Sequence, residues 1–429
     1  MNQTFSRFTY ITFIILFIVI APALIFYALG YRYNWTNRNI EKNGALYIKS
    51  YPNNAEIYID GQKIKPKTPT QVVDISSGKY DISVKKDKYQ TWTKKLEIYS
   101  GETTFAEDIV LFLENREKTT LSKGGADWLL NKQKNQYCYL DNEHNLNITN
   151  VEQGKDIFVF KFDKKYQLID WSPNNASLLL NLDNSYYLFD LDQKTFHKLN
   201  ITKANKIIWD NNDSNLLWYQ KDNKIYRHYI NSTDTTDKII NSPLIFVDFD
   251  LAGDYLLALT TNNINYQFQK IKKNTLEITD SIENLNQGTL KAWQANEDFS
   301  LFSLGGGFYI KKINTNAVVI PHTIVDIHDD RILFTNGYET SIYNCKDNWS
   351  TLIDRSSQVV TDVLWHPNGS YFLSESNDQT YITEIDGRDK RNTIDVLQNP
   401  LKKLYLFNKK GNRLFVLTPE ENFYLTIQE

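Results

Sequence analysis

The most apolar part of the chain lies at its N-terminus. Residues 8–31 contain no charged side chain, and Arg7 and Arg32 bound this stretch. A helix of 24 residues is about 36 Å long, which is enough to cross the roughly 30 Å hydrocarbon core of a bilayer. Tyrosines near both ends suit the membrane–water interfaces. The pattern predicts a transmembrane signal anchor at residues 8–31, preceded by an N-terminal tail at residues 1–7.

Two other interpretations of this segment remain open. Ala28-Leu29-Gly30 resembles a small-residue cleavage site, so the segment is also compatible with a cleaved secretory signal. A buried core helix is the third interpretation. The flanking charges do not decide the orientation, because basic residues stand on both sides of the span. We expect the body of the protein to be extracytoplasmic, since single N-terminal anchors most often export the domains attached to their C-terminal ends.

A second pattern, with a period of two residues, begins after an expected linker at residues 32–44. Ile57 and Ile59 lie on one face of a strand that Asp60-Gly61 ends in a tight turn, a strong hairpin signal. Residues 80–85 alternate in the same way, as a half-buried strand does. The turn-rich segment Lys65 to Thr70 is expected to be a crossing between strands. Residues 45–113 are therefore predicted to form a small β-sandwich of five or six strands.

The motif residues of this segment resemble those of a known family. They are Pro52 to Gly61 with the sequence PNNAEIYIDG, then Thr68-Pro69, Gly78-Lys79-Tyr80 and Tyr89. This order is similar to the PEGA domain, with Asn53 and Asn54 where the family has Glu and Gly. The resemblance implies an extracytoplasmic β-domain of an envelope protein, with no catalytic residues to carry over.

The rest of the chain repeats itself. Apolar-aromatic runs recur at spacings of 34 to 44 residues, close to the 40–45 residues of a four-stranded propeller blade. The positions that mark the runs are Trp128, Trp171, Trp209, Phe249, Trp293, Ile327, Trp365 and Phe407. This period predicts a β-propeller at residues 123–429, with eight blades expected and seven as the alternative. A pair of unrelated β-sandwiches is a further alternative.

Two of the repeats carry a fuller turn sequence. They are Trp171-Ser172-Pro173-Asn174-Asn175 and Trp365-His366-Pro367-Asn368-Gly369. Both resemble the Trp-Ser-Pro-Asp-Gly turn of WD40-like propeller repeats, and the resemblance implies the same architecture. The fold class that we expect is therefore all-β, with an N-terminal transmembrane helix, a small PEGA-like β-sandwich and then the propeller.

The last repeat predicts how the ring closes. Residues 402–407, 413–417 and 423–427 supply three strands, and a fourth is missing. Residues 118–121, inside an expected linker and closing strand at residues 114–122, are placed to supply it. Pairing the two ends in one sheet removes open strand edges, which otherwise invite aggregation.

Composition narrows the function. The chain has 48 basic and 51 acidic residues and a net charge of −3, so it lacks the clustered basic excess that nucleic-acid binding needs. Aromatic residues make up 14%, which favours β-structure. The two cysteines, Cys138 and Cys345, fall in different repeats and are expected to be packed thiols rather than a disulfide.

Candidate chemistry is sparse. His322, Asp326 and His328 form the one local histidine cluster, and a metal site could use them. However, residues 324–328 are expected to be an inner strand of the sixth blade, which makes a surface or channel-lining patch the preferred interpretation. Asp248 to Asp254 faintly resembles a calcium loop but lacks two of the required ligands. Gly305-Gly306-Gly307 has no following Lys-Ser or Lys-Thr and is expected to be a hairpin turn.

We therefore assign no catalytic, cofactor-binding or metal-binding residues, no cofactor, and no enzyme activity from the sequence. The expected function is that of a single-pass cell-membrane protein whose extracytoplasmic body is a binding scaffold. Its expected partners are the lipid bilayer, through the N-terminal helix, and a protein or a cell-wall or surface polymer, but not nucleic acid. The alternatives are an envelope hydrolase, acting on glycan or peptide with carboxylates near the propeller channel, and a scaffold on the inner face of the membrane.

Overall fold

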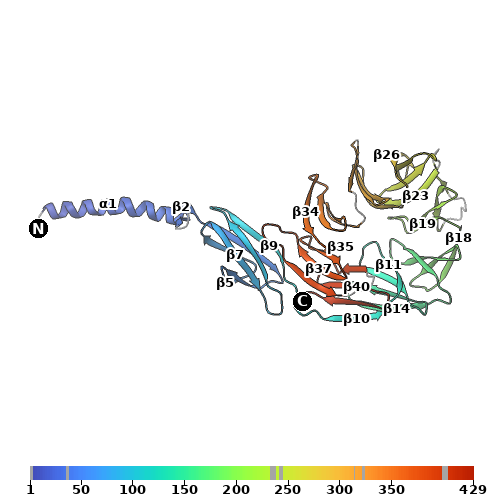
Figure 1. The fold of residues 1–429 in the computed structure, drawn as a ribbon, viewed down its shortest axis with the longest axis horizontal. Helices are drawn as coiled ribbons and strands as arrows, with labels where there is room; N and C mark the ends of the chain where they lie inside the picture. The colour runs from blue at the N-terminus through green and yellow to red at the C-terminus, as the bar shows by residue number, and fades with distance from the viewer. Residues whose placement is uncertain are drawn as a thin grey trace.

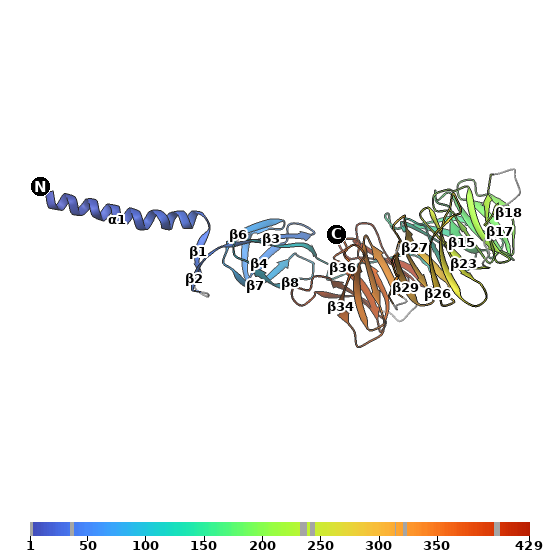
Figure 2. The same cartoon turned by 90° about the horizontal axis from the view of Figure 1, so that it is seen from above.

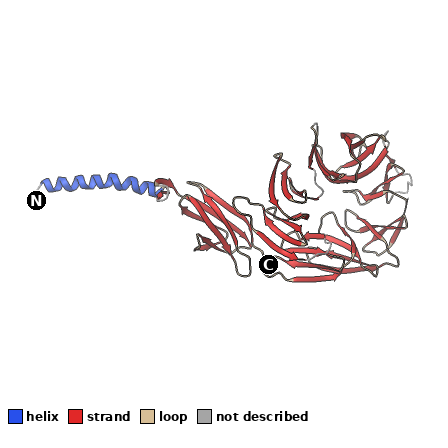
Figure 3. Ribbon diagram, in the orientation of Figure 1, coloured by secondary structure: helices blue, strands red, loops and turns tan. Residues whose placement is uncertain are grey.

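The computed structural model describes residues 3–34, 38–231, 238–240, 245–313, 315–320, 324–398 and 404–429. The molecule is elongated (Figure 1, Figure 2). A single helix extends from one end, a small β-domain follows it, and a large ring of sheets forms the other end. Strands make up nearly all of the regular structure after the helix (Figure 3).

Helix α1 spans Gln3–Ala28. Its segment Thr9–Ala28 has a mean hydropathy of 2.7, and none of it is buried against the protein. By length and composition this helix is able to cross a membrane. Because no part of the β-domains covers it, the described structure gives no support to the alternative of a buried core helix.

The segment expected to be a linker contains a hairpin. Strands β1 (Tyr31–Asn34) and β2 (Asn39–Lys42) pair in antiparallel register, with Tyr33 opposite Ile40. The polar composition of this short segment concealed the alternation. Residues 35–37, between the two strands, lie outside the described part of the chain.

The small β-domain is a sandwich of two sheets. One has the strand order β6-β3-β9 and the other β5-β4-β7-β8. The strands are β3 Gly44–Tyr51, β4 Glu56–Ile59, β5 Gln62–Lys67, β6 Thr70–Ile75, β7 Gly78–Lys85, β8 Trp92–Ile98 and β9 Thr103–Val110. Alternate residues of β3 and β8 face inward, so Leu46, Ile48 and Leu96 are buried in a common core.

The domain has seven strands rather than five or six. The expected crossing from Lys65 to Thr70 begins inside strand β5, which pairs with β4 and includes Pro66. Proline is tolerated there because β5 is an edge strand of its sheet. Strand β9 pairs with β3 in parallel, unlike the other pairs of the described sheets.

Eight four-stranded sheets follow, and we call them blades 1 to 8. The strands of the first four blades are, for blade 1, β11 Ala126–Leu130, β12 Gln136–Leu140, β13 Asn145–Asn150 and β14 Lys155–Lys161; for blade 2, β15 Gln167–Trp171, β16 Ser177–Leu182, β17 Ser185–Asp190 and β18 Phe196–Thr202; for blade 3, β19 Lys206–Trp209, β20 Leu216–Lys221, β21 Lys224–Tyr229 and β22 Lys238–Ile239; for blade 4, β23 Ile245–Ala252, β24 Tyr255–Thr261, β25 Tyr266–Lys272 and β26 Ile278–Leu285.

The strands of the other four are, for blade 5, β27 Leu290–Ala295, β28 Phe299–Leu304, β29 Gly307–Lys312 and β30 Val318–Ile320; for blade 6, β31 Ile324–His328, β32 Arg331–Thr335, β33 Glu339–Asn344 and β34 Trp349–Arg355; for blade 7, β35 Val360–Trp365, β36 Tyr371–Ser376, β37 Gln379–Glu384 and β38 Thr393–Gln398; for blade 8, β39 Leu404–Phe407, β40 Arg413–Leu417, β41 Glu421–Thr426 and β10 Lys118–Lys123.

The eight positions that marked the repeat all lie on the first strands of these blades, from Trp128 on β11 to Phe407 on β39. A cluster of buried apolar side chains lies between each blade and the next. Another cluster, which contains Tyr137, Tyr139 and Phe415, joins blade 8 back to blade 1. The blades therefore form a closed ring, the β-propeller that the period predicted.

The ring closes as the sequence indicated. Strand β10, from the segment before the first blade, pairs antiparallel with the last strand, β41, with Thr119 opposite Tyr424. Blade 8 thus combines one strand that precedes the ring with three that end it. The first and last segments of the propeller are therefore held in one four-stranded sheet.

Candidate binding site at the domain junction

The small β-domain contacts the propeller at blade 7. Strands β8 and β9 of that domain pack on β36 and on the turn between β37 and β38, residues 385–392. In an antiparallel blade the first and third turns lie at the same end, so the contact falls on one face of the propeller. The first turn of blade 7, residues 366–370, lies at this end as well.

A buried ion pair forms the centre of the junction. The Lys94 ammonium, on β8, lies 2.9 Å from the Glu384 carboxylate, and the two side chains are 0% and 5% exposed. Lys94 also donates to the main-chain oxygen of Asp386 at 2.6 Å. The indole of Trp92 donates to the other Glu384 oxygen at 3.0 Å. Desolvated charges are tolerated only when they are paired and hydrogen-bonded, so these contacts fix the relative position of the two domains.

One feature of the sequence points to this pair, namely the position of Lys94 within strand β8. In strand β8, Trp92, Lys94, Leu96 and Ile98 all face inward. A lysine in that apolar register requires a buried partner. Its partner, Glu384, lies 290 residues further along the chain, which no local pattern identifies.

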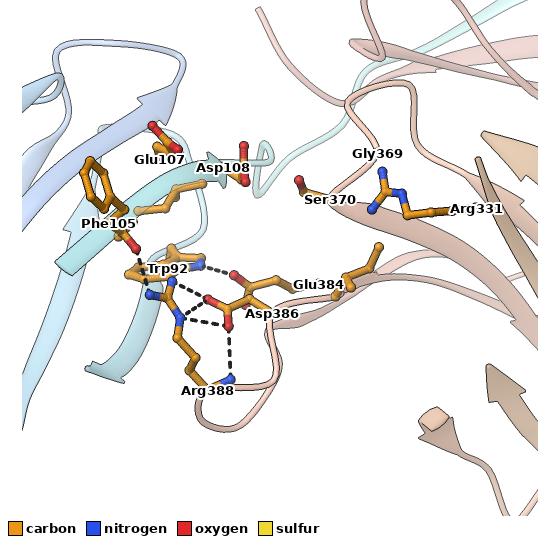
Figure 4. Close-up of a pocket in the computed structure, with 13 residues that line it drawn as sticks. Trp92, Phe105, Glu107, Asp108, Arg331, Gly369, Ser370, Glu384, Asp386 and Arg388 are labelled. Carbon is orange, nitrogen blue, oxygen red and sulfur yellow. Dashed lines mark hydrogen bonds and ion pairs between the residues drawn. The ribbon is translucent and has the colours of Figure 1, made fainter. Parts of the chain in front are cut away.

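Arg388 reinforces the rim of the junction. Its guanidinium binds the Asp386 carboxylate through two nitrogens and donates to the Phe105 main-chain oxygen at 2.7 Å (Figure 4). Burial alone would raise the pKa of Asp386, but hydrogen bonds from Arg388 and the charge of Lys94 outweigh it and lower that pKa. Asp386 therefore stays ionised, and its bidentate contact orients the guanidinium toward β9.

An apolar contact lies beside these charges. Val110 and Phe112 belong to the same buried cluster as Tyr371 and Leu414 of blades 7 and 8. The Tyr371 hydroxyl accepts a hydrogen bond from the Val110 amide at 3.2 Å, and burial raises the pKa of this phenol. The Phe112 ring meets His366 edge-on at 5.8 Å. Burial lowers the pKa of His366, so the imidazole packs here as a neutral ring.

A pocket of about 340 Å³ opens between the domains. Figure 4 shows Glu107 and Asp108 of β9 on one side and Arg331 of blade 6 on the other, with Ser370 between them. The Arg331 guanidinium lies 4.8 Å above the Trp365 ring. The pocket is thus charged on both walls, which suits contacts with a polar surface more than enclosure of a small apolar ligand.

Carboxylates on the first strands of the propeller join neighbouring blades. Asp170 accepts hydrogen bonds from the Trp171 amide and, in the next blade, from the Trp209 amide, both at 2.8 Å. Asp250 bridges blades 4 and 5 in the same way. Burial raises the pKa of both carboxyls, although the amide hydrogen bonds oppose that rise. These groups are occupied with main-chain donors, which gives them a structural role.

Two lysines of the β11–β12 turn in blade 1 reach across the ring. Lys132 donates to the Asn211 side chain of blade 3 at 2.8 Å, and the Lys134 ammonium lies 3.6 Å from Asp326 of blade 6. Blade 1 neighbours blades 2 and 8, so both contacts cross the central channel. Burial lowers the pKa of Lys132, and nearby carboxylates, Asp170 first, partly offset this.

The structure describes only part of the histidine cluster. Asp326 lies on β31, the first strand of blade 6, as predicted, and accepts from the Trp365 amide at 2.8 Å. His328 packs with its ring centroid 5.8 Å from Trp365. His322 lies outside the described residues. Among the residues that are described, no group of three or more potential metal ligands occurs.

The two loop motifs have structural roles. Asp248 and Asp250 lie on β23, where both accept main-chain amides of blade 5, and Gly253 turns the chain with a φ of +54°. Gly305 and Gly306 form the two-residue turn between β28 and β29, with φ of +56° and +86°. Glycine is favoured at these positions because it adopts a positive φ without steric strain.

The two cysteines are free thiols in different blades. Burial raises the pKa of both, that of Cys345 to about 11, so neither is activated as a nucleophile.

Comparison with known families identifies the small domain. Residues 43–108 match the PEGA domain family. That part of the chain is therefore a PEGA domain, as its motif residues indicated. No curated protein matches the chain significantly.

The fold of the chain is also similar to that of solved structures. The crystal structure of the eukaryotic initiation factor has a TM-score of 0.52 at 12% identity and covers 81% of this chain and 98% of that one. The Dos1 propeller has a TM-score of 0.48 at 12% identity, covering 72% and 94%. BamB from Moraxella catarrhalis has 0.46 at 8% identity, covering 73% and 100%. At such identities the likeness concerns the fold alone. The chain thus combines an apolar N-terminal helix, a PEGA domain and a β-propeller.

Proposed function

We propose that this protein is a membrane-anchored, extracytoplasmic binding scaffold. Helix α1 remains in the bilayer, the PEGA domain stands next to the membrane, and the propeller presents its loops to a protein or a cell-surface polymer. Propellers serve such roles because their loops project from a rigid framework.

The observation that carries the proposal is the order in which the helix, the PEGA domain and the propeller are connected along the molecule. An apolar helix exposed along Thr9–Ala28 leads into a PEGA domain, and that domain shares the buried Lys94–Glu384 pair with blade 7. A buried pair at this position would hold the propeller in one orientation relative to the PEGA domain that follows the helix. A presenting scaffold needs that property, whereas a secreted enzyme does not.

The chemistry of the channel favours binding over hydrolysis. A glycosidase needs two carboxyl groups facing a common substrate, at separations of about 5 to 10 Å. Here Asp170, Asp250 and Asp326 accept main-chain amides of neighbouring blades. The lysines of the blade 1 turn cross the same channel. We therefore assign the described channel carboxylates to the framework rather than to catalysis.

Protease accessibility tests the topology. An epitope tag on the C-terminus of the full chain should be digested by protease added to intact cells, or to spheroplasts where a wall intervenes. A cytoplasmic marker should survive in the same sample. Carbonate washing should leave the tagged protein in the membrane fraction. A tag that survives until the cells are lysed would place the propeller in the cytoplasm, and release by carbonate would argue against a retained anchor.

Co-sedimentation tests the binding role. The full chain in nanodiscs should sediment with isolated cell envelopes from a strain that lacks this protein. Treating the envelopes with protease, or with a wall-degrading enzyme, distinguishes a protein partner from a polymer. Equal sedimentation of empty nanodiscs, or no sedimentation at all, would contradict the proposal.

A further inference from the structure

The β1–β2 hairpin has the reverse of the usual arrangement of polar and apolar faces. Its register places Tyr31, Tyr33, Ile40 and Lys42 on one face, with Arg32 and Glu41 on the other. A two-stranded ribbon on a soluble protein normally turns its apolar face inward and its charges to water. In this hairpin both charged side chains of the Arg32 and Glu41 face contact the small domain.

Polar contacts dock the charged face. The Arg32 guanidinium lies 3.5 Å from the Asp74 carboxylate of the PEGA domain, and the Ser77 hydroxyl donates to the Glu41 carboxylate. Arg32 also donates to the Tyr27 main-chain oxygen at the end of helix α1, at 2.6 Å, and lies over the Tyr27 ring. One side chain thus connects the helix, the hairpin and the PEGA domain.

The opposite face exposes apolar side chains, whereas Lys42 on the same face lies beside Gly101 of the PEGA domain. Tyr33 is 47% exposed and Ile40, directly opposite it, is 67% exposed. Tyr31 is 36% exposed, and its ring meets Phe26 of helix α1 edge-on at 5.4 Å. The exposed face of the hairpin is therefore continuous with the exposed apolar surface of the helix.

We infer that the outward face of this hairpin lies in the interfacial layer of the bilayer, next to the point where α1 leaves the hydrocarbon core. The inference rests on the proposed membrane role of α1. Tyrosine suits this layer because its ring is apolar and its hydroxyl is polar. Lys42, on the same face, can extend its ammonium to the headgroups. The partner is thus a lipid surface, contacted by Tyr31, Tyr33 and Ile40.

This contact would define the height and tilt of the PEGA domain. A single helix leaves the attached domain free to swing, whereas a second contact beside the helix restricts it. Arg32 and Glu41 transmit the restriction, because they hold the hairpin to the domain. The propeller would then be presented at one orientation to the membrane.

Spin labels test the inference in the full chain. The protein is reconstituted in nanodiscs of phosphatidylethanolamine and phosphatidylglycerol, with Cys345→Ser to remove the more accessible thiol; Cys138 is fully buried. A nitroxide is attached to the Ile40→Cys variant. Its collisions with oxygen, which concentrates in lipid, are compared with its collisions with a water-soluble nickel chelate. The matched control is Ile264→Cys, an isoleucine of the propeller that is 83% exposed.

We expect the label at position 40 to show severalfold fewer nickel collisions than the label at position 264, and more oxygen collisions. Equal accessibilities at the two positions would overturn the inference. A label at position 40 shielded from both reagents and broadened by a second spin would also overturn it, in favour of a contact between two copies.

A third label separates this inference from the proposed function. The Leu16→Cys variant reports on the middle of helix α1. Lipid exposure at position 16 with water exposure at position 40 refutes the hairpin contact and leaves the anchor standing. Water exposure at both positions refutes the anchor and, with it, the inference. Lipid exposure at position 16 with an interfacial label at position 40 supports both.

Discussion

The PEGA domain is joined on its two sides by ionic contacts of opposite character. Toward the propeller, Lys94 and Glu384 are 0% and 5% exposed and share hydrogen bonds with Trp92 and with the main chain. Toward the helix, Arg32 and Asp74 are 24% and 59% exposed, at 3.5 Å. One joint is part of a folded interior, and the other is open to its surroundings.

The difference shows what each joint can do alone. A buried pair whose charges are matched resists separation, because each charge would have to leave its partner. An exposed pair contributes about 0–1 kcal/mol and is weakened by salt. We therefore expect the propeller and the PEGA domain to move as one body. The helix joint needs a further contact, which the membrane would provide.

Breaking the propeller joint should have the largest effect. Lys94→Ala leaves the Glu384 carboxylate buried without its cation, so we expect a loss of about 3–5 kcal/mol of unfolding free energy. Urea denaturation of the full chain in detergent measures this loss. Limited proteolysis should also cut near residues 114–117, between the two domains. A loss below about 1 kcal/mol would show that the pair does not hold the joint.

Two controls accompany this variant. Lys95→Ala removes a neighbouring lysine that is 53% exposed and pairs with Asp81, so it should change stability by less than about 0.5 kcal/mol. Replacing both charges, with Lys94→Met and Glu384→Leu, should recover part of the loss, because no unpaired charge remains although the Trp92 indole loses its acceptor. Failure of the double variant to exceed Lys94→Ala would point to packing rather than charge.

The apolar side of the same joint should give an intermediate effect. Tyr371→Phe keeps the ring but leaves the Val110 amide without its acceptor, which we expect to lower the unfolding free energy by about 2 kcal/mol. Thermal unfolding followed by near-ultraviolet circular dichroism checks this. The control is Tyr338→Phe, whose ring is 54% exposed in blade 6. Equal effects in the two variants would contradict the role of the hydroxyl.

A pH experiment tests the stability of blade 7 itself. It uses Asp362, which lies on strand β35 of that blade. Burial, the largest cause, raises the pKa of Asp362 to about 6. At pH values between the ordinary pKa of aspartate, near 4, and about 6, the Asp362 carboxyl binds its proton more tightly in the folded state than in the unfolded state. Stability contributed by Asp362 therefore falls as pH rises through this window.

Asp362→Asn should remove that fall. We expect the variant to be about 3 kcal/mol more stable than the unaltered protein at pH 8, with the advantage vanishing toward pH 4. Urea titrations at several pH values measure it. Asp329→Asn, at a side chain that is 84% exposed, is the control and should show no such trend. A variant less stable at pH 8 would contradict the assigned direction.

The helix joint should respond least. Arg32→Ala removes an exposed pair and two bonds to main-chain carbonyls, and we expect less than about 1 kcal/mol of change in detergent. In nanodiscs the same variant should broaden the orientation of the PEGA domain, measured by spin-label mobility in that domain. A large loss of stability in detergent would mean that the two joints are alike.

The sequence predicted the repeating and local features well. The positions from Trp128 to Phe407 identified the first strand of every blade, and residues 118–121 were correctly placed in the closing strand. These features depend on periodicity and turn chemistry, which neighbouring residues determine.

The junction could not be predicted because its parts are remote in the chain. Lys94 and Glu384 are 290 residues apart, and Glu384 lies in a strand whose local pattern is ordinary. The β1–β2 hairpin was missed for a different reason. Its four-residue strands are too short to show a clear alternation, and its apolar side chains face outward.

The distance between the PEGA domain and the propeller tests the central claim most directly. Spin labels on Lys63→Cys and Ile264→Cys in the full chain, with Cys345→Ser, allow this distance to be measured by pulsed dipolar spectroscopy in nanodiscs. The account predicts one narrow distance distribution, which Lys94→Ala broadens. A broad distribution in the protein with Lys94 intact would contradict it, because the propeller would then swing freely on the PEGA domain.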